Sequence, residues 1–154
     1  MLFKQLYFEH YKPLYRFIVL RTNSDEAAKD LTQDVFMRLW RNRKKLKIRT
    51  SLRAYLYRAA ANAVIDFHRR KSRERQYLSG LARDEMGAVD DNLELRTSLL
   101  MAIDNLPEDI RLAYTLSRYD GLKSAEIAEV CGVAIRTIEY RLQRAREQLR
   151  EQLL

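Results

Sequence analysis

Apolar residues recur along most of the chain at the three- and four-residue spacing of amphipathic α-helices. No stretch alternates cleanly as a half-buried strand would, and four glycines and two prolines offer few turns for a sheet protein. The pattern therefore predicts an all-α fold. A length of 154 residues suits one ordinary domain or two small ones.

The N-terminal half is expected to contain several helices. The first covers residues 3–11, and Pro13 should kink the chain or start a second helix that ends near residue 21. Ser24 is the expected N-cap of a helix over residues 25–41, and Ser51 can cap another that ends near residue 70. The positions predicted to face the core are Ala28, Leu31, Val35 and Leu39 in the former helix, and Leu52, Leu56, Ala59, Ala63 and Phe67 in the latter.

Helical periodicity fades between residues 71 and 91, where two glycines lie among many polar residues. Helices are expected again over residues 92–105 and from Pro107 to about residue 119. The chain should therefore consist of two small helical domains, residues 1–72 and 92–154, joined by a flexible linker over residues 73–91.

Residues 122–149 carry the most informative pattern of the chain. They predict a short helix capped by Ser124, a left-handed turn at Gly132 and a longer helix, which together make a helix-turn-helix. In the longer helix Ile138, Leu142, Ala145 and Leu149 should pack inward. The opposite face carries residue types that contact base edges and phosphates: Arg136, Tyr140, Gln143, Arg144 and Glu147. An ordinary solvated face is the competing interpretation.

Charge strengthens the nucleic-acid interpretation. The formal net charge is +8 and the pI is about 9.7, which suits a polyanionic partner. Fourteen basic and two acidic residues lie between residues 38 and 76, whereas eight acidic and two basic residues lie between residues 77 and 110. A basic block, an acidic connector and a basic terminal helix indicate two modules that bind a polyanion.

Two surfaces in the N-terminal half stay ambiguous from the pattern alone. The face of residues 52–70 that points away from the predicted core contains Tyr57, Arg58, Ala61, Asn62, Ile65 and Arg69. This face could bind unstacked bases and phosphates, or simply be solvated. In the preceding helix Phe36, Met37 and Trp40 lie beside the apolar stripe, so either the core extends around the helix or these side chains form a patch for another protein.

Several functional classes are excluded by the sequence. It has no glycine-rich phosphate loop, no cluster of metal ligands and no paired nucleophile and base, so we expect no enzyme, no cofactor and no metal. No apolar run is long enough for a bilayer and no signal-peptide core is present, so we expect no membrane insertion. The single cysteine, Cys131, excludes an internal disulfide and fits the cytoplasm.

Three segments in this order resemble the alternative sigma factors of bacterial RNA polymerase, of the extracytoplasmic-function (ECF) type. They are DLTQDVFMRLW at residues 30–40, SLRAYLYRAAANAVIDFHRR at 51–70 and LPEDIRLAYTLSRYDGLKSAEIAEVCGVAIRTIEYRLQRAREQL at 106–149. The run KLKIRTSLRAYLYRAAAN is similar to sigma factors paired with outer-membrane uptake systems. The resemblance makes residues 1–72 a region 2-like domain and residues 92–154 a region 4-like domain.

The resemblance also implies roles for particular residues. Asn62 would hold a flipped base of the minus-ten element, and the melted strand would contact Tyr57, Arg58, Asp66, Arg69 and Arg70. The minus-thirty-five duplex would be read by Arg136, Thr137, Glu139, Tyr140, Arg141, Gln143 and Arg144. The coiled coil of the largest polymerase subunit would bind Asp30, Gln33, Asp34, Phe36, Met37 and Trp40.

The partners that the resemblance implies are core RNA polymerase, promoter DNA and an anti-sigma factor, which can be membrane-bound. The expected function is promoter-specific transcription initiation, with capture of the melted minus-ten strand. A stand-alone regulator that dimerises on a palindrome would also explain the helix-turn-helix. That alternative leaves the matching N-terminal segments and the acidic linker without a role.

Overall fold

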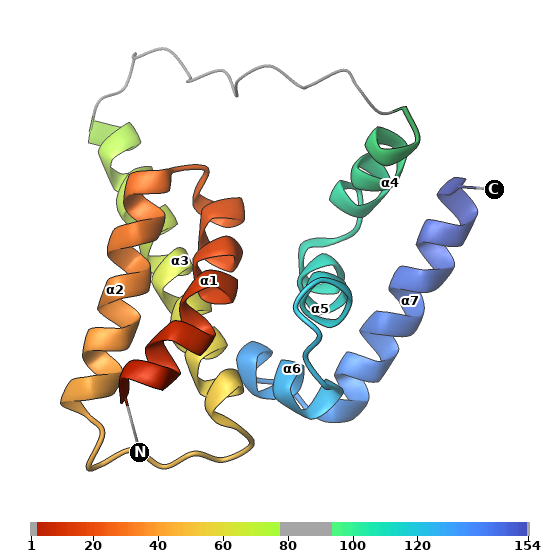
Figure 1. The fold of residues 1–154 in the computed structure, drawn as a ribbon. Coiled ribbons are helices and arrows are strands. Elements are labelled where there is room, and N and C mark those ends of the chain that lie inside the picture. The colour runs from red at the N-terminus through yellow and green to blue at the C-terminus, as the bar shows by residue number, and fades with distance from the viewer. Residues whose placement is uncertain (1–2, 78–93, 154) are drawn as a thin grey trace. The chain divides into compact units, whose positions relative to one another are not determined.

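The computed structural model describes residues 3–77 and 94–153, and these form two helical units (Figure 1). The N-terminal unit contains α1 (Phe3–Thr22), α2 (Asp25–Arg41) and α3 (Leu52–Tyr77). The C-terminal unit contains α4 (Glu94–Asp104), α5 (Glu108–Arg118), α6 (Ser124–Cys131) and α7 (Ile135–Leu153). The all-α prediction is confirmed. Most of the predicted linker lies outside the described residues, but its first positions, 73–77, belong to α3.

Helix α1 runs through Pro13, so the predicted start of a second helix at that residue is wrong. An interior proline removes one backbone hydrogen bond and costs about 3 kcal/mol. Burial on both sides of the proline offsets this cost, because Leu6 precedes it and Leu14, Phe17 and Ile18 follow it in the core against α2 and α3.

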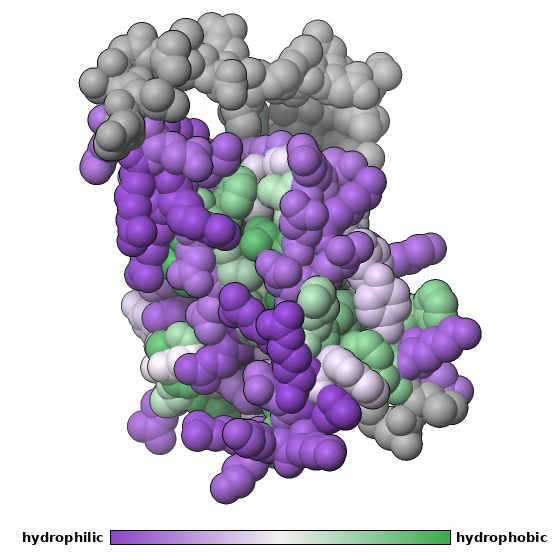
Figure 2. Space-filling view, turned by 90° about the vertical axis from the view of Figure 1, so that its left-hand side faces the viewer, coloured by the Kyte–Doolittle hydropathy of each residue, from purple (hydrophilic) through white to green (hydrophobic). Residues whose placement is uncertain are grey.

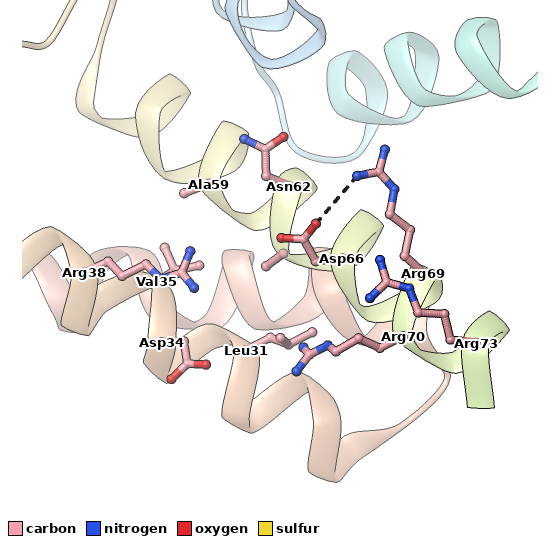
Figure 3. A pocket seen from close by; sticks show the side chains of 11 residues that line it. Leu31, Asp34, Val35, Arg38, Ala59, Asn62, Asp66, Arg69, Arg70 and Arg73 are labelled. Carbon is pink, nitrogen blue, oxygen red and sulfur yellow. Dashed lines mark ion pairs between the residues drawn. The ribbon is translucent and has the colours of Figure 1, made fainter. Parts of the chain in front are cut away.

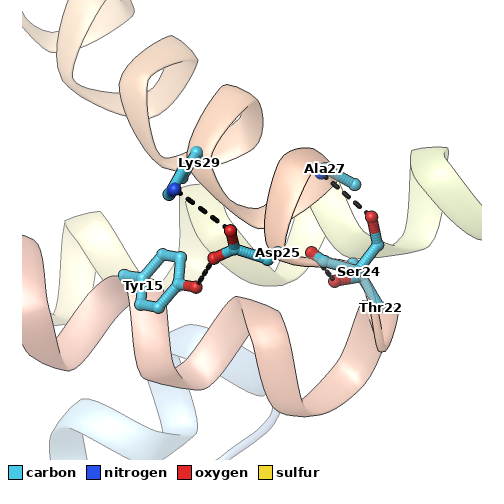
Figure 4. A network of polar contacts seen from close by, with 6 residues as sticks. All are labelled: Tyr15, Thr22, Ser24, Asp25, Ala27 and Lys29. Carbon is cyan, nitrogen blue, oxygen red and sulfur yellow. Dashed lines mark hydrogen bonds and ion pairs between the residues drawn. The ribbon is translucent and has the colours of Figure 1, made fainter.

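The capping predictions for α2 and α3 are confirmed. The hydroxyl of Ser24 accepts the backbone N–H of Ala27 at 3.1 Å, and that of Ser51 accepts the N–H of Ala54 at 3.0 Å. Beside the first cap, Asp25 accepts a hydrogen bond from the Tyr15 hydroxyl and pairs with Lys29 at 3.0 Å (Figure 4). The Tyr15 and Lys29 contacts hold the pKa of the Asp25 carboxyl below its usual value.

The buried face of α3 differs from the prediction by about one residue. Leu56, Ala60 and Val64 are buried, together with Tyr57 and Ala54, whereas the predicted inward positions Ala59, Ala63 and Phe67 are only half-buried. Both sets of residues have helical spacing, and the alanine run 59–61 does not distinguish them. Packing between helices decides which of the two sets faces the core. The Tyr57 ring packs edge-on against the Phe17 ring of α1, with the centroids 5.3 Å apart.

The C-terminal unit packs α4, α5 and α6 against α7. Its core contains Ala102, Ile103, Leu106, Ile110, Ala145 and Leu149. Gly132 ends α6 in the left-handed conformation at φ 69°, so the predicted glycine turn is confirmed. The predicted cap at Ser124 is wrong, because Ser124 is the first helical residue and Lys123 precedes the helix. At the N-terminus of α6, the carboxylate of Glu126 instead accepts a hydrogen bond from the backbone N–H of Lys123 at 2.9 Å.

Within residues 3–77 and 94–153, no helix is both long enough and apolar enough to span a bilayer. The same residues contain no group of three His, Cys, Asp or Glu side chains placed to hold a metal ion.

Candidate nucleic-acid interface

A groove of about 480 Å³ lies between α2 and α3 in the N-terminal unit (Figure 3). Its floor is apolar and its rim is charged. Figure 3 shows Arg38 of α2 and Arg70 of α3 extending into the space between the helices, while Asn62 and Arg69 project from the outer side of α3. The groove is lined by Leu31, Asp34, Val35 and Arg38 of α2 and by Ala59, Asn62, Ala63, Asp66, Arg69, Arg70 and Arg73 of α3. Alanines at the two half-buried positions of α3 leave the space open between the helices.

This groove, which we call the cationic groove, is electropositive. Four arginines and two aspartates line it, so its formal charge is four minus two, or +2. Asp66 neutralises little of this charge, because its Oδ1 lies 4.0 Å from Nη1 of Arg69 and both side chains are largely exposed. Guanidinium groups around an apolar floor suit a nucleic-acid strand, since phosphates pair with arginine while bases contact apolar surface.

Five of the six residues predicted to contact a melted strand lie on the outer side of α3. Asn62, Asp66, Arg69 and Arg70 line the groove, and Arg58 is exposed on the same helix. Tyr57 is a correction: its ring is 2% exposed and packs on Phe17, so the prediction that it faces the strand is wrong.

Two further arginines complete the groove although the sequence analysis assigned them no site. Arg38 lies one turn after Asp34 in α2, and Arg73 lies one turn after Arg69 in α3. The spacing of four residues was visible in the sequence, but the approach of α2 to α3 was not.

The face of the N-terminal unit shown in Figure 2 is mostly hydrophilic, with hydrophobic side chains visible between the charged ones. A second groove in this unit, of about 420 Å³, is largely apolar, and we call it the aromatic groove. It is lined by Phe3, Tyr7, Gln33, Phe36, Met37, Trp40 and Arg41. Trp40 is 46% exposed and Met37 is 50% exposed, so this groove offers large apolar side chains to a partner.

The aromatic residues of α2 differ in burial, which bears on the two interpretations of this helix. Phe36 is 2% exposed and its ring lies 4.9 Å from that of Tyr7, so it supports the aromatic groove from the core and offers a partner little surface of its own. The core extends around α2 as far as Phe36. Trp40 remains accessible beside Phe3, with the ring centroids 4.9 Å apart.

The residues predicted to dock polymerase do not form one surface. Gln33, Met37 and Trp40 line the aromatic groove, whereas Asp34 lines the cationic groove on the other flank of α2. Asp30 is exposed and lines neither. Phe3 and Tyr7 of α1, which the sequence analysis did not single out, complete the aromatic groove because α1 packs along α2.

The predicted recognition helix α7 presents a polar face. Arg136, Glu139, Tyr140 and Gln143 are exposed, while Ile138, Leu142, Ala145 and Leu149 are buried as predicted. Thr137 is half-buried. Glu147 contacts two residues of this face, since its carboxylate accepts from Arg144 at 2.9 Å and from Gln143 at 3.3 Å. The face therefore carries arginine, amide and carboxylate side chains, three and four residues apart, that are able to form paired hydrogen bonds with base edges.

Arg141 departs from this arrangement. Its side chain is 18% exposed, and its Nε lies 3.5 Å from Oδ2 of Asp109 on α5. The burial of the Arg141 side chain therefore argues against its predicted contact with DNA.

Comparison with protein families assigns each unit separately. Residues 6–74 match the family model described as Sigma-70 region 2, and residues 96–149 match the one described as Sigma-70, region 4. The first match contains both grooves apart from Phe3, and the second contains the helix-turn-helix.

Individual relatives agree with this assignment. The chain is 30% identical to the ferric citrate uptake sigma factor FecI of Escherichia coli, over 94% of this chain and 87% of that protein. It is 32% identical to the ECF sigma factor SigE of Mycolicibacterium smegmatis over 94% of its own length, but spans 59% of that longer protein. Among solved structures, the sigma factor RpoE of Bartonella quintana, in complex with the anti-sigma factor NepR, aligns with a TM-score of 0.75 and 28% identity. That alignment covers 98% of this chain and 96% of RpoE.

Proposed function

This chain belongs to the ECF sigma factors of bacterial RNA polymerase, which direct promoter-specific transcription initiation, and from that premise we propose how its two units divide the task. The N-terminal unit captures the melted minus-ten strand and docks polymerase. The C-terminal unit reads the upstream duplex. The observation that carries this proposal is the cationic groove between α2 and α3, whose lining includes the amide of Asn62.

The groove between α2 and α3 supports strand capture through three kinds of contact. Its four arginines supply charge for phosphates, and its alanines and Leu31 supply apolar surface for base faces. The exposed amide of Asn62 can donate to and accept from the edge of a flipped base. Extruding a base costs a few kcal/mol, which such contacts can return.

Helix α7 supports reading of duplex DNA because it follows the turn of a helix-turn-helix and exposes residues suited to base edges. Arg136 and Arg144 can contact guanine, Gln143 can contact adenine, and Glu139 can accept from a cytosine amine. Glu147 pairs with Arg144 and limits its freedom before DNA binds. The minus-thirty-five element is the proposed target of this face.

The aromatic groove of α1 and α2 is the proposed docking site for the coiled coil of the polymerase. Exposed Trp40 and Met37 fit the role of apolar anchors, which dominate the energy of many protein interfaces. We extend the proposal to an anti-sigma factor that covers these surfaces, as the structural relative RpoE was solved with NepR. We place the protein in the cytoplasm, where the polymerase acts.

Reconstitution with purified core polymerase tests the proposal directly. The chain should co-elute with core polymerase in size-exclusion chromatography and direct initiation from a subset of a promoter library. Elution as a dimer that ignores polymerase, with binding to palindromic duplexes, would favour a stand-alone regulator. A folded chain that neither binds polymerase nor starts transcription from any template would refute the proposal.

A further inference from the structure

One arginine of the recognition helix is held by another helix of its unit. Arg141 of α7 lies 3.5 Å from Asp109 of α5, and its side chain is 18% exposed. Arg144 of the same helix pairs only three residues away, with Glu147, and its side chain is 41% exposed. The contact of Arg141 therefore ties α7 to its scaffold, whereas that of Arg144 stays within the exposed helix.

The carboxylate of Asp109 is itself anchored. Its Oδ1 accepts the backbone N–H of Ile110 at 2.9 Å in the first turn of α5, and its Oδ2 faces Arg141. A carboxylate in the first turn is stabilised by the unpaired N–H groups and the partial positive charge of the helix N-terminus. Asp109, whose side chain is 58% exposed, thus links the first turn of α5 to Arg141 in the middle of α7.

The charges of the pair also influence a side chain at the turn between α6 and α7. Cys131, the last residue of α6, is half-buried, and its burial raises the pKa of its thiol. The charge of Arg141 lowers that pKa and the charge of Asp109 raises it, both by less than burial does. Helices α5, α6 and α7 pack against one another, and the ion pair joins two of these three helices.

We propose that Asp109 and Arg141 are positioning residues that set the orientation of α7, and that Arg141 supports duplex reading through this contact and not by touching DNA. The inference rests on the proposed function of α7 and deepens it. Base edges are recognised by paired hydrogen bonds with demanding geometry, whereas phosphates tolerate small displacements. Loss of the pair should therefore reduce discrimination between sequences more than general affinity for duplex DNA.

Thiol modification tests the contact without DNA. The chain has one cysteine, so the rate at which dithiobis(nitrobenzoate) modifies the full chain reports on the α6–α7 turn. Arg141→Gln and Asp109→Asn should each raise that rate by about threefold or more through local opening, and the double variant should react no faster. Through charge alone, Arg141→Gln would slow the reaction and Asp109→Asn would accelerate it. Opposite changes, or no change, would overturn the inference.

Duplex binding by the full chain then separates positioning from contact. The wild-type chain first selects duplexes from a randomised pool, and the selected and scrambled duplexes become the probes. Arg141→Gln and Asp109→Asn should each reduce the preference for the selected duplex about tenfold, without further loss in the double variant. The dependence of affinity on salt should stay at the wild-type slope.

The matched control is Arg136→Gln, which removes the same charge from the exposed first turn of α7. This variant should lower the salt slope by about 0.9 and leave the Cys131 rate unchanged. A similar fall in slope for Arg141→Gln, with Asp109→Asn unaffected, would make Arg141 a DNA contact and overturn the inference. If the wild-type chain selects no duplex, the proposed reading function fails, while the thiol rates still decide whether the pair holds the turn.

Discussion

Replacing Asn62 by alanine probes the cationic groove at the position best suited to recognise a base. Asn62 is the single side-chain amide among the described residues that line the groove. Because it is exposed on α3, its loss should change the folding free energy by no more than about 0.5 kcal/mol, and alanine is the better helix former. Two well-placed hydrogen bonds to a base edge are worth about 1–3 kcal/mol. The variant should therefore form about 5- to 150-fold less open complex, at about 1.4 kcal/mol per factor of ten.

The assay uses the holoenzyme reconstituted with core polymerase. Fluorescence of 2-aminopurine in the melted segment reports strand opening, and anisotropy of a fully paired upstream fragment reports duplex binding. Gln76→Ala is the matched control, because it removes the same functional group from an exposed position of α3 that does not line the groove. Equal losses of opening and duplex binding, or an unchanged yield of open complex, would refute the assignment of Asn62 to base capture.

Three further perturbations test other parts of the structure. Trp40→Ala should weaken binding to core polymerase by about tenfold or more, as measured by titration of labelled protein, whereas Leu20→Ala, which removes an exposed side chain outside the aromatic groove, should not. Gly132→Ala should lower the free energy of unfolding by about 1–2 kcal/mol in urea titrations, because φ is +69° there although no atom lies within 4 Å of the added Cβ. Asp25 has a lowered pKa, chiefly from its Tyr15 contact, so the stability it contributes is present above the unfolded pKa of about 3.9 and is lost as the pH falls through the folded value. Asp25→Asn should therefore flatten the decline of the thermal midpoint below about pH 4, and an undiminished decline would contradict that role.

Interactions between residues close in sequence determine many local features of this protein. Helical spacing predicted α2 within its observed bounds, and Ser24 and Ser51 cap as expected because a hydroxyl at the N-cap satisfies an N–H group in the first turn. Gly132 was predictable for the same kind of reason, since a left-handed residue between two helices favours glycine. These features depend on residues three or four positions apart.

Other features needed contacts between distant residues. Pro13 stays inside α1 because the helix is buried on both sides of it, and Tyr57 is buried because Phe17 of another helix receives its ring. The alanine run of α3 fits two orientations equally well, so its own pattern cannot choose which flank faces the core. The chosen orientation places Ala59 and Ala63 beside α2 and Asn62 and three arginines of α3 along the cationic groove.

The sequence by itself determined the all-α fold, most of the helices, the caps of α2 and α3 and the two basic segments, because each follows from residue types and from intervals of one or two helical turns. Only the tertiary structure decided which charged side chains share a site. It assigned Asp34 to the groove with the arginines, placed Phe36 in the core and joined Arg141 to Asp109. The physical reason is that helical periodicity specifies the angle between residues on one helix, whereas the rotation of that helix against its neighbours is set by the packing of all of them together.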